Sequence, residues 1–206
     1  RISGKINFND VFIDSAFFTS IIGSYVYEDN IIISDNIKII SEEFEGEVKV
    51  HSLTNNEKYD LSGYIKFYDF TNHNSLKQYN LDSLSGKLEF QYLKNINKSN
   101  ISAQINLQDG LLFNKTFNQF EGQISMEVIN DKYTGNSKGV FIGWNYDPYS
   151  WDNIHYKVNY SDFDTSYYNI RASSSTGDSL DISGSKTIHG NYNISNCIGL
   201  LKQNEL

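Results

Sequence analysis

Cysteine and proline are almost absent from this chain of 206 residues, which contains one of each. The single cysteine, Cys197, cannot form an intrachain disulfide, so the fold is not that of a small disulfide-stabilised secreted domain. At this length a chain can bury a core without such bonds. The apolar neighbours Ile194, Ile198 and Leu200 predict that Cys197 is a small buried side chain rather than a reactive thiol.

Basic residues are also scarce. Lysine and arginine number 17 against 25 acidic residues, which gives a formal net charge of −8, and only Arg1 and Arg171 are arginines. A protein that neutralises phosphates needs clustered lysine and arginine. The composition therefore argues against nucleic acid and against an anionic membrane surface. A cationic partner, a neutral sugar and a large protein stay open.

Long apolar runs and catalytic motifs are missing too. No run reaches the roughly 18–20 residues that a membrane-spanning helix needs, and no nucleophile elbow or glycine-rich phosphate loop occurs. We therefore expect no transmembrane segment, and a non-enzymatic role is favoured, although an enzyme with paired carboxylates stays open. The start at Arg1 already resembles a strand and has no leader-like segment, which suggests a mature or trimmed product.

What the chain does have is a seven-residue phrase that recurs five times. Its order is apolar, Ser or Glu, Gly, any residue, apolar, polar, apolar. The copies are Ile2–Phe8, Phe44–Val50, Leu61–Phe67, Leu84–Phe90 and Phe120–Met126. This period of two sends the apolar side chains to one face of a strand, and glycine in a strand marks a bulge, a bend or a close backbone approach. The phrase predicts antiparallel strands with one solvent-exposed face.

The whole chain is predicted to be a single all-β domain. Strands are expected at 2–8, 11–18, 22–27, 30–40, 44–51, 59–69, 84–92, 100–107, 110–113, 119–129, 138–144, 154–160, 166–172 and 179–184. Their spacing of about 8–15 residues favours an antiparallel β-barrel or barrel-like sandwich with very little helix. A sub-division into 1–43, 44–145 and 146–206 is possible, with 44–145 as a barrel-like core. Residues 186–206 lose the alternation and are expected to wrap or fray.

The sharpest local feature is the aromatic segment 141–152, which holds both tryptophans and the only proline. Pro148 stiffens the segment, and aromatic rings on a stiff turn make a contact platform at small entropic cost. Further aromatic residues follow directly. We predict a weakly acidic binding face formed by Trp144, Tyr146, Tyr149, Trp151, His155, Tyr156 and Tyr160. The alternative is that Trp144 and Trp151 close one end of the core.

Evidence in the sequence for a cofactor is slight. Acidic residues cluster in two stretches and would suit a structural calcium ion. They are Asp147, Asp152, Asp162, Asp164, Asp178 and Asp181. The four histidines, His51, His73, His155 and His189, are far apart, so no zinc motif is present. His73 and His155 are the candidates for ligation of haem iron.

Residues 44–144 resemble the lipobarrel of transferrin-binding-protein-B-like bacterial surface proteins. The resemblance rests on the order of short glycine-punctuated segments that leads to the strand Gly139–Gly143. It implies a closed barrel and the capture of a host protein, haem or metal carrier at a bacterial surface. After Gly143 the chain departs from that family, because Trp144–Trp151 replaces the usual small-acidic-Gly-Gly segment.

A second resemblance concerns phrases such as Leu84–Phe90, which look like the β-groove repeats of AsmA- and TamB-like lipid-handling proteins of the bacterial envelope. Three functions from different classes are thus predicted. The first is a non-enzymatic binding module, extracellular or at a bacterial cell surface, that captures a protein, haem or glycan ligand. The second is a lipid-handling groove, for which one continuous apolar face lined by the odd positions of the glycine phrases is expected. A carbohydrate-active enzyme or sugar-binding module is the third alternative.

Overall fold

The protein is described from a computed structural model that covers residues 1–13, 16–53, 58–68, 81–82, 85–112, 115–130, 132–146, 149–161, 165–187 and 190–201. Within these residues all regular structure is β-strand. The strands are β1 (Ile2–Ile13), β2 (Ala16–Glu28), β3 (Ile31–Ile40), β4 (Phe44–Leu53), β5 (Lys58–Phe67), β6 (Leu81–Asp82), β7 (Ser85–Asn95), β8 (Lys98–Leu112), β9 (Lys115–Ile129), β10 (Lys132–Tyr146), β11 (Tyr149–Ser161), β12 (Thr165–Ser173), β13 (Ser179–Thr187) and β14 (Tyr192–Leu200).

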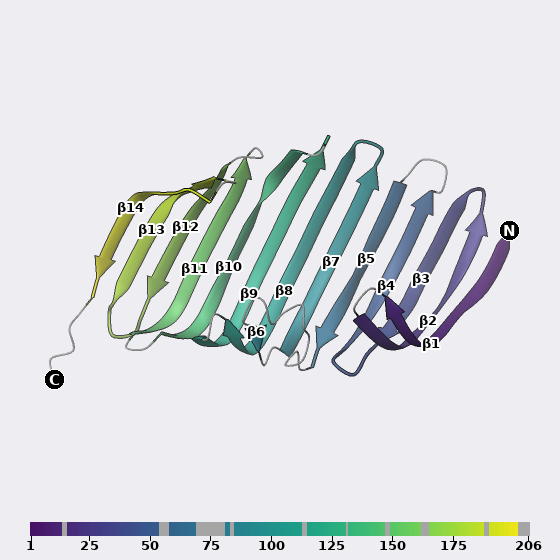
Figure 1. Ribbon diagram of the computed structural model, residues 1–206, viewed down its shortest axis with the longest axis horizontal. Coiled ribbons are helices and arrows are strands. Elements are labelled where there is room, and N and C mark those ends of the chain that lie inside the picture. Colours follow the sequence, from purple (N-terminus) through teal and green to yellow (C-terminus); the bar gives the residue numbers. More distant parts are fainter. Residues whose placement is uncertain are drawn as a thin grey trace.

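The strands form one antiparallel sheet in which almost every strand pairs with its neighbours in sequence (Figure 1). The short β6 is the exception, because it pairs with the end of β8 and lies off the main path. Strands that follow one another in sequence need only short turns. Asp29 and Asn30, for example, both have positive φ between β2 and β3, which is the requirement of a type I′ hairpin turn.

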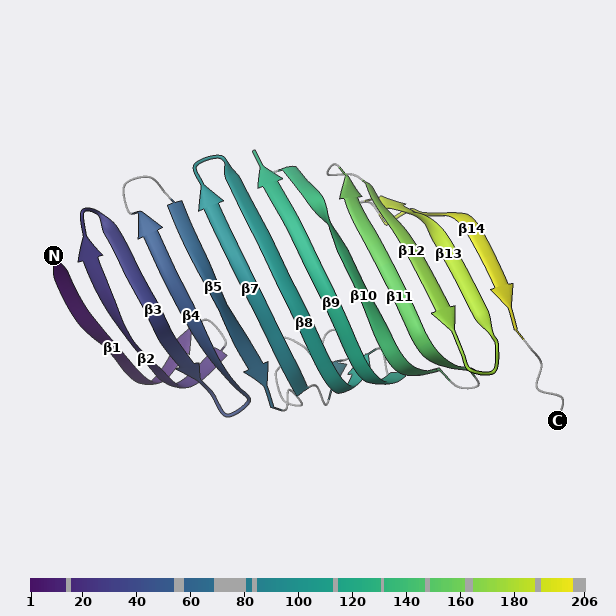
Figure 2. The ribbon, with the colours of Figure 1, turned by 180° about the vertical axis from the view of Figure 1, so that it is seen from behind.

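The sheet is a single layer. Its solvent-accessible surface is 13462 Å², whereas a compact protein of 23.6 kDa would expose about 9,800 Å². Figure 2 shows the reverse side of the sheet, and no second sheet or helix formed by the described residues lies across the middle of either face. Among the described apolar residues, the buried ones are Phe44, Phe117, Phe120 and Ala172.

The buried residues gather where the long strands bend. Four residues with positive φ lie inside strands towards this end of the sheet: Asp10 in β1, Gly86 in β7, Asp109 in β8 and Gly143 in β10. Positive φ inside a strand breaks the alternation and turns its direction. Phe117 and Phe120, which are three residues apart on β9, belong to the same buried cluster. The lower strand ends in Figures 1 and 2 curve round accordingly.

The all-β, antiparallel prediction is confirmed, and no helix occurs in the described residues. The sheet is open, since no pairing joins β1 to β14. Each inner strand of the row already pairs with two neighbours, so the sheet can stay open with β1 and β14 as its edge strands. The sheet also runs through the proposed sub-divisions, at the β3–β4 and β10–β11 pairings, and the single-domain interpretation stays a prediction.

Four finer predictions were wrong. The predicted strand 11–18 spans the end of β1 and the start of β2, and the predicted strands 100–107 and 110–113 are one strand, β8. Residues 192–200 form the edge strand β14 rather than a wrapping tail. Cys197 is exposed, because its strand is paired on one side only and no layer covers it.

Candidate functional site

The largest candidate surface is one face of the sheet, because the register aligns apolar and glycine positions across neighbouring strands. We call this surface the apolar face and define it, from β4 to β13, by three rows of directly paired residues. The row nearest the bend is Gly46, Ile65, Leu88, Ile105, Gly122, Gly139, Tyr156, Ile170 and Ile182; the next is Val48, Gly63, Phe90, Ala103, Ile124, Ser137, Val158, Tyr168 and Gly184; the third is Val50, Leu61, Tyr92, Ile101, Met126, Gly135, Tyr160, Ser166 and Lys186.

Most of these side chains are only half-buried. Ile65, Leu88 and Ile124 fall in this intermediate class, since each touches its neighbours on the same face and lacks a covering layer. The exposed fraction is larger at the strand ends far from the bend: Tyr59 is 37% and Tyr133 is 47% exposed there. Monomeric proteins rarely leave a contiguous apolar surface of more than a few hundred Å² in water unless it serves an interaction.

Aromatic rings that lie flat over glycines keep parts of the apolar face close to the backbone of the sheet. A ring lies over the glycine directly opposite it on the apolar face (Gly139 and Tyr156, Gly184 and Tyr168), at the bend (Gly110 and Phe117) and between β1 and β2 (Gly4 and Tyr25). A Cβ atom added at any of these glycines would lie closer than 3.0 Å to the ring opposite. Each ring therefore lies over glycine backbone instead of standing away from the sheet.

The predicted aromatic binding residues do not form one patch. Trp144 belongs to the cluster at the bend and stacks on Phe117, with ring centroids 6.2 Å apart and an angle of 14° between the planes. Trp151, half-buried, lies directly opposite Trp144. Tyr146 and Tyr149 pair at the ends of β10 and β11, and their side chains lie outside the described residues.

The remaining three predicted residues divide between the two faces. Tyr156 and Tyr160 are half-buried on the apolar face, where Tyr156 stacks parallel to Phe120 at 6.1 Å and its hydroxyl lies 3.2 Å from Ser137 Oγ. His155, which directly precedes Tyr156 in sequence, is exposed on the opposite face. The structure therefore brings Trp144 and Tyr156 together around Phe141 and separates His155 from both.

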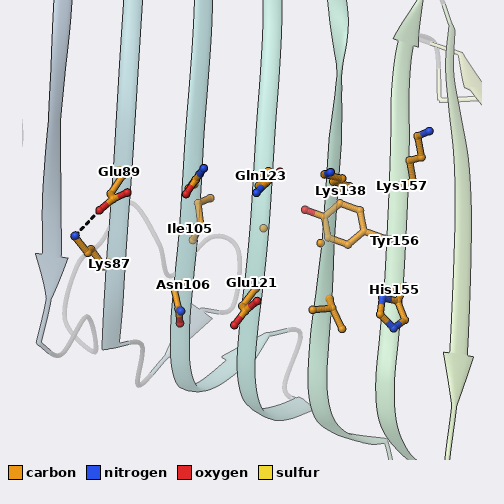
Figure 3. Close-up of a pocket in the computed structure, with 14 residues that line it drawn as sticks. Lys87, Glu89, Ile105, Asn106, Glu121, Gln123, Lys138, His155, Tyr156 and Lys157 are labelled. Atoms are coloured by element: carbon orange, nitrogen blue, oxygen red, sulfur yellow. Dashed lines mark hydrogen bonds and ion pairs between the residues drawn. The ribbon is translucent and has the colours of Figure 1, made fainter.

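The opposite face carries polar and charged side chains, and we call it the polar face. Its central row reads Glu47, Tyr64, Glu89, Gln104, Gln123, Lys138, Lys157, Asn169 and Ser183. A hollow of about 690 Å³ is lined mostly by residues of the polar rows on β7 to β11 (Figure 3). Sequence reasoning missed this hollow, because only the register reveals which polar residues become neighbours.

Glu45 and Tyr68 make one polar-face contact with a measurable consequence. A hydrogen bond from the Tyr68 hydroxyl is the main cause that lowers the pKa of Glu45, with Lys66 adding to it, and the same bond raises the pKa of Tyr68. A carboxyl group whose pKa is lower in the folded state than in the unfolded state stabilises the fold at pH values above its unfolded pKa. This contribution is lost as the pH falls through the pKa of the folded state.

We expect Tyr68→Phe to raise the pKa of Glu45 towards its ordinary value, because the donor is removed while Lys66 stays in place. An NMR titration of the Glu45 side-chain carbon between pH 2 and pH 7 measures the shift. Ser62→Ala, on the same strand as Lys66, is the control and should leave the titration of Glu45 unchanged. An unaltered midpoint in Tyr68→Phe would show that Tyr68 does not donate to Glu45.

Metal and haem sites gain no geometric support from the described part of the chain. It contains no group of three histidine, cysteine, aspartate or glutamate residues that could hold an ion. Asp147, Asp162, Asp164, His73 and His189 lie outside the described residues. The calcium and haem hypotheses thus stay predictions.

The described residues form no helix that is long and apolar enough to cross a membrane. No family model, no curated protein and no solved structure matches this chain.

Proposed function

We propose that the chain is a lipid-handling module that binds acyl chains along its apolar face. The observation that carries this proposal is the register, which places the odd positions of the described glycine phrases on one uncovered apolar surface. This is the surface expected of the lipid-handling groove, the second of the three functions predicted from the sequence. The resemblance to AsmA- and TamB-like β-grooves supports the same class.

The energetics favour a hydrocarbon ligand. Strands lie about 4.8 Å apart, so the nine-strand rows from β4 to β13 extend for about 40 Å. Each methylene removed from water contributes about 0.8 kcal/mol, and an acyl chain supplies many of them without polar groups that would have to be desolvated. The glycine–aromatic pairs help, because rings that lie close to the backbone let a flexible acyl chain contact several strands at once.

A glycan is less well suited to this face. Sugar hydroxyls need hydrogen-bonding partners when they are desolvated, and the apolar rows offer few of them; the Ser137 hydroxyl already lies within hydrogen-bond distance of Tyr156. The capture of a protein or of haem by the aromatic residues Trp144 to Tyr160, at a cell surface or outside the cell, stays the competing proposal. Haem is therefore included in the test.

The test is fluorescence titration of the purified chain with a dansylated fatty acid, followed by displacement with palmitate. We expect saturable binding and full displacement. Met126→Lys should weaken the binding at least tenfold, because it places a charge in the middle of the third apolar row. Ser125→Lys is the matched control: it adds the same charge one residue earlier, on the exposed polar face, and should bind as the wild type does.

Circular dichroism checks that both variants are folded, and Met126→Gln replaces Met126→Lys if the latter unfolds. Absence of displaceable binding by the wild type would overturn the proposal, and so would an equal loss in the two lysine variants. A Soret shift on titration with haem, together with failure of palmitate to compete, would favour the competing function.

A further inference from the structure

Two lysines face each other on the polar face. Lys138 of β10 lies directly opposite Lys157 of β11. Such pairs have Cβ atoms about 4.5–5.5 Å apart, and like charges at this distance are destabilising. The chain has 25 acidic residues against 17 basic ones, so a carboxylate opposite a lysine would be the ordinary arrangement. In this sheet the two positive charges of Lys138 and Lys157 lie opposite each other instead.

Other lysines of the sheet do have acidic partners. Lys66 lies 3.4 Å from Glu45, Lys87 pairs with Glu89, and Lys98 pairs with Glu127. Among the described residues, no ion pair or hydrogen bond joins Lys138 or Lys157 to a carboxylate.

The residues around the two lysines are amides or are otherwise engaged. Gln123 lies opposite Lys138 on one side, and Asn169 lies opposite Lys157 on the other. The nearby Glu121 accepts a hydrogen bond of 2.7 Å from Gln119 Nε2. The carboxylates of Glu89 and Glu121 line the same hollow as Lys87, Lys138 and Lys157, so the lysines exceed the glutamates there by one positive charge.

Both lysines line the hollow of about 690 Å³, together with His155, Gln123, Gln104 and Asn106. In Figure 3, Lys157 and His155 lie along β11, and Lys138 lies on the adjacent β10. The volume is in the range of small-molecule sites, which is about 300–1,000 Å³. The hollow combines three lysines, two of them without an ion-pair partner among the described residues, and two glutamates with amide groups that both donate and accept hydrogen bonds.

We propose that this hollow binds an acidic carbohydrate, a sugar that carries a phosphate or a carboxylate. Lys138 and Lys157 would hold the anionic group, and Gln104, Asn106 and Gln123 would hydrogen-bond the hydroxyls. The site lies on the face opposite the acyl-binding rows, so it stands whether or not acyl chains bind there.

The test is an NMR titration of the 15N-labelled chain with glucose 6-phosphate, glucose and inorganic phosphate in parallel. We expect glucose 6-phosphate to bind with a dissociation constant of about 1 mM or tighter and to shift amide signals near residues 123, 138 and 157. Glucose and phosphate should each bind at least tenfold more weakly. Lys138→Gln and Lys157→Gln should each weaken the binding of glucose 6-phosphate about tenfold, since each removes one charge.

Lys132→Gln is the control, because Lys132 is exposed on β10 and outside the hollow; it should bind as the wild type does. The lysine variants of the hollow should be at least as stable as the wild type, because each relieves the repulsion. Failure of glucose 6-phosphate to shift these signals, or equal effects of all three substitutions, would overturn the proposal. If inorganic phosphate binds as tightly as glucose 6-phosphate, the carbohydrate part is wrong.

Discussion

Phe117→Ala is expected to lower the free energy of unfolding by about 3–5 kcal/mol, the usual cost of removing a buried phenylalanine ring. Phe117 is 2% exposed, the least of the buried apolar residues. Its ring meets Phe141 edge to face at 5.5 Å, stacks on Trp144 and lies over Gly110. Since the rest of the sheet is a half-buried single layer, the bend carries a large share of the packing, and a cavity there has few other contacts to compensate for it.

Urea denaturation followed by circular dichroism measures the change. Phe8→Ala is the control, because Phe8 is 56% exposed, and its loss should be within about 0.5 kcal/mol, as for most surface positions. Tryptophan fluorescence should change in Phe117→Ala because Trp144 loses its stacking partner. Equal stabilities of the two variants would mean that the bend is not the core of this protein.

Which side of each strand is apolar could be predicted from the sequence. In the phrase Leu61–Phe67, the alternation assigns Leu61, Gly63, Ile65 and Phe67 to one side, and the register places all four on the same face. Alternation is a local property of the backbone, so no tertiary information is needed.

What covers that side could not be predicted. The same alternation occurs in a barrel, a sandwich and an open sheet, because it reports only that two faces differ. The half-buried state of Ile65 and Leu88 follows from the absence of a second layer, which is a property of the whole chain. The resemblance to a lipobarrel implied a closed barrel, whereas no pairing joins β1 to β14; the resemblance itself stays a prediction.

The bend was present in the sequence in a form that suggested something else. Gln108, Asp109 and Gly110 have the composition of a turn between two strands. Asp109 does adopt positive φ, but the chain then continues in the same strand, β8, and turns the end of the sheet over the apolar face. The residue type at Asp109 favours positive φ. The pairing of β8 with β9 continues on both sides of Asp109, so the chain bends there and does not reverse.

The aromatic binding residues were predicted from their proximity in sequence, which is a poor guide to proximity on a face. His155 and Tyr156 are adjacent and therefore point to opposite faces. Tyr156 belongs with Gly139, its cross-strand partner, and His155 with the lysine pair of the polar face. Pairing each strand with its neighbour would have found both groupings, because the sheet follows the sequence order.

Gly63→Ala is expected to destabilise the fold by about 1–3 kcal/mol, the range of overpacking in a closely packed site. A Cβ atom at Gly63 would lie closer than 3.0 Å to the carbonyl oxygen of Glu47 on β4 and 3.1 Å from Cα of Val48. These are backbone atoms of the paired strand, so no side chain can rotate away to make room. The glycine is thus required for the close approach of β4 and β5 and not for flexibility.

Gly199→Ala is the matched control and should have the opposite sign. At Gly199 the nearest atom to an added Cβ would be Leu180 Cδ1 at 3.6 Å, an ordinary contact, and alanine in a strand is favoured over glycine by roughly 0.5–1 kcal/mol. Urea denaturation of both variants should place the wild type between them. If Gly63→Ala were as stable as Gly199→Ala, the recurring glycines would not be what allows the strands of the apolar face to pack closely. The low surface proposed to bind acyl chains would then depend on the aromatic rings alone.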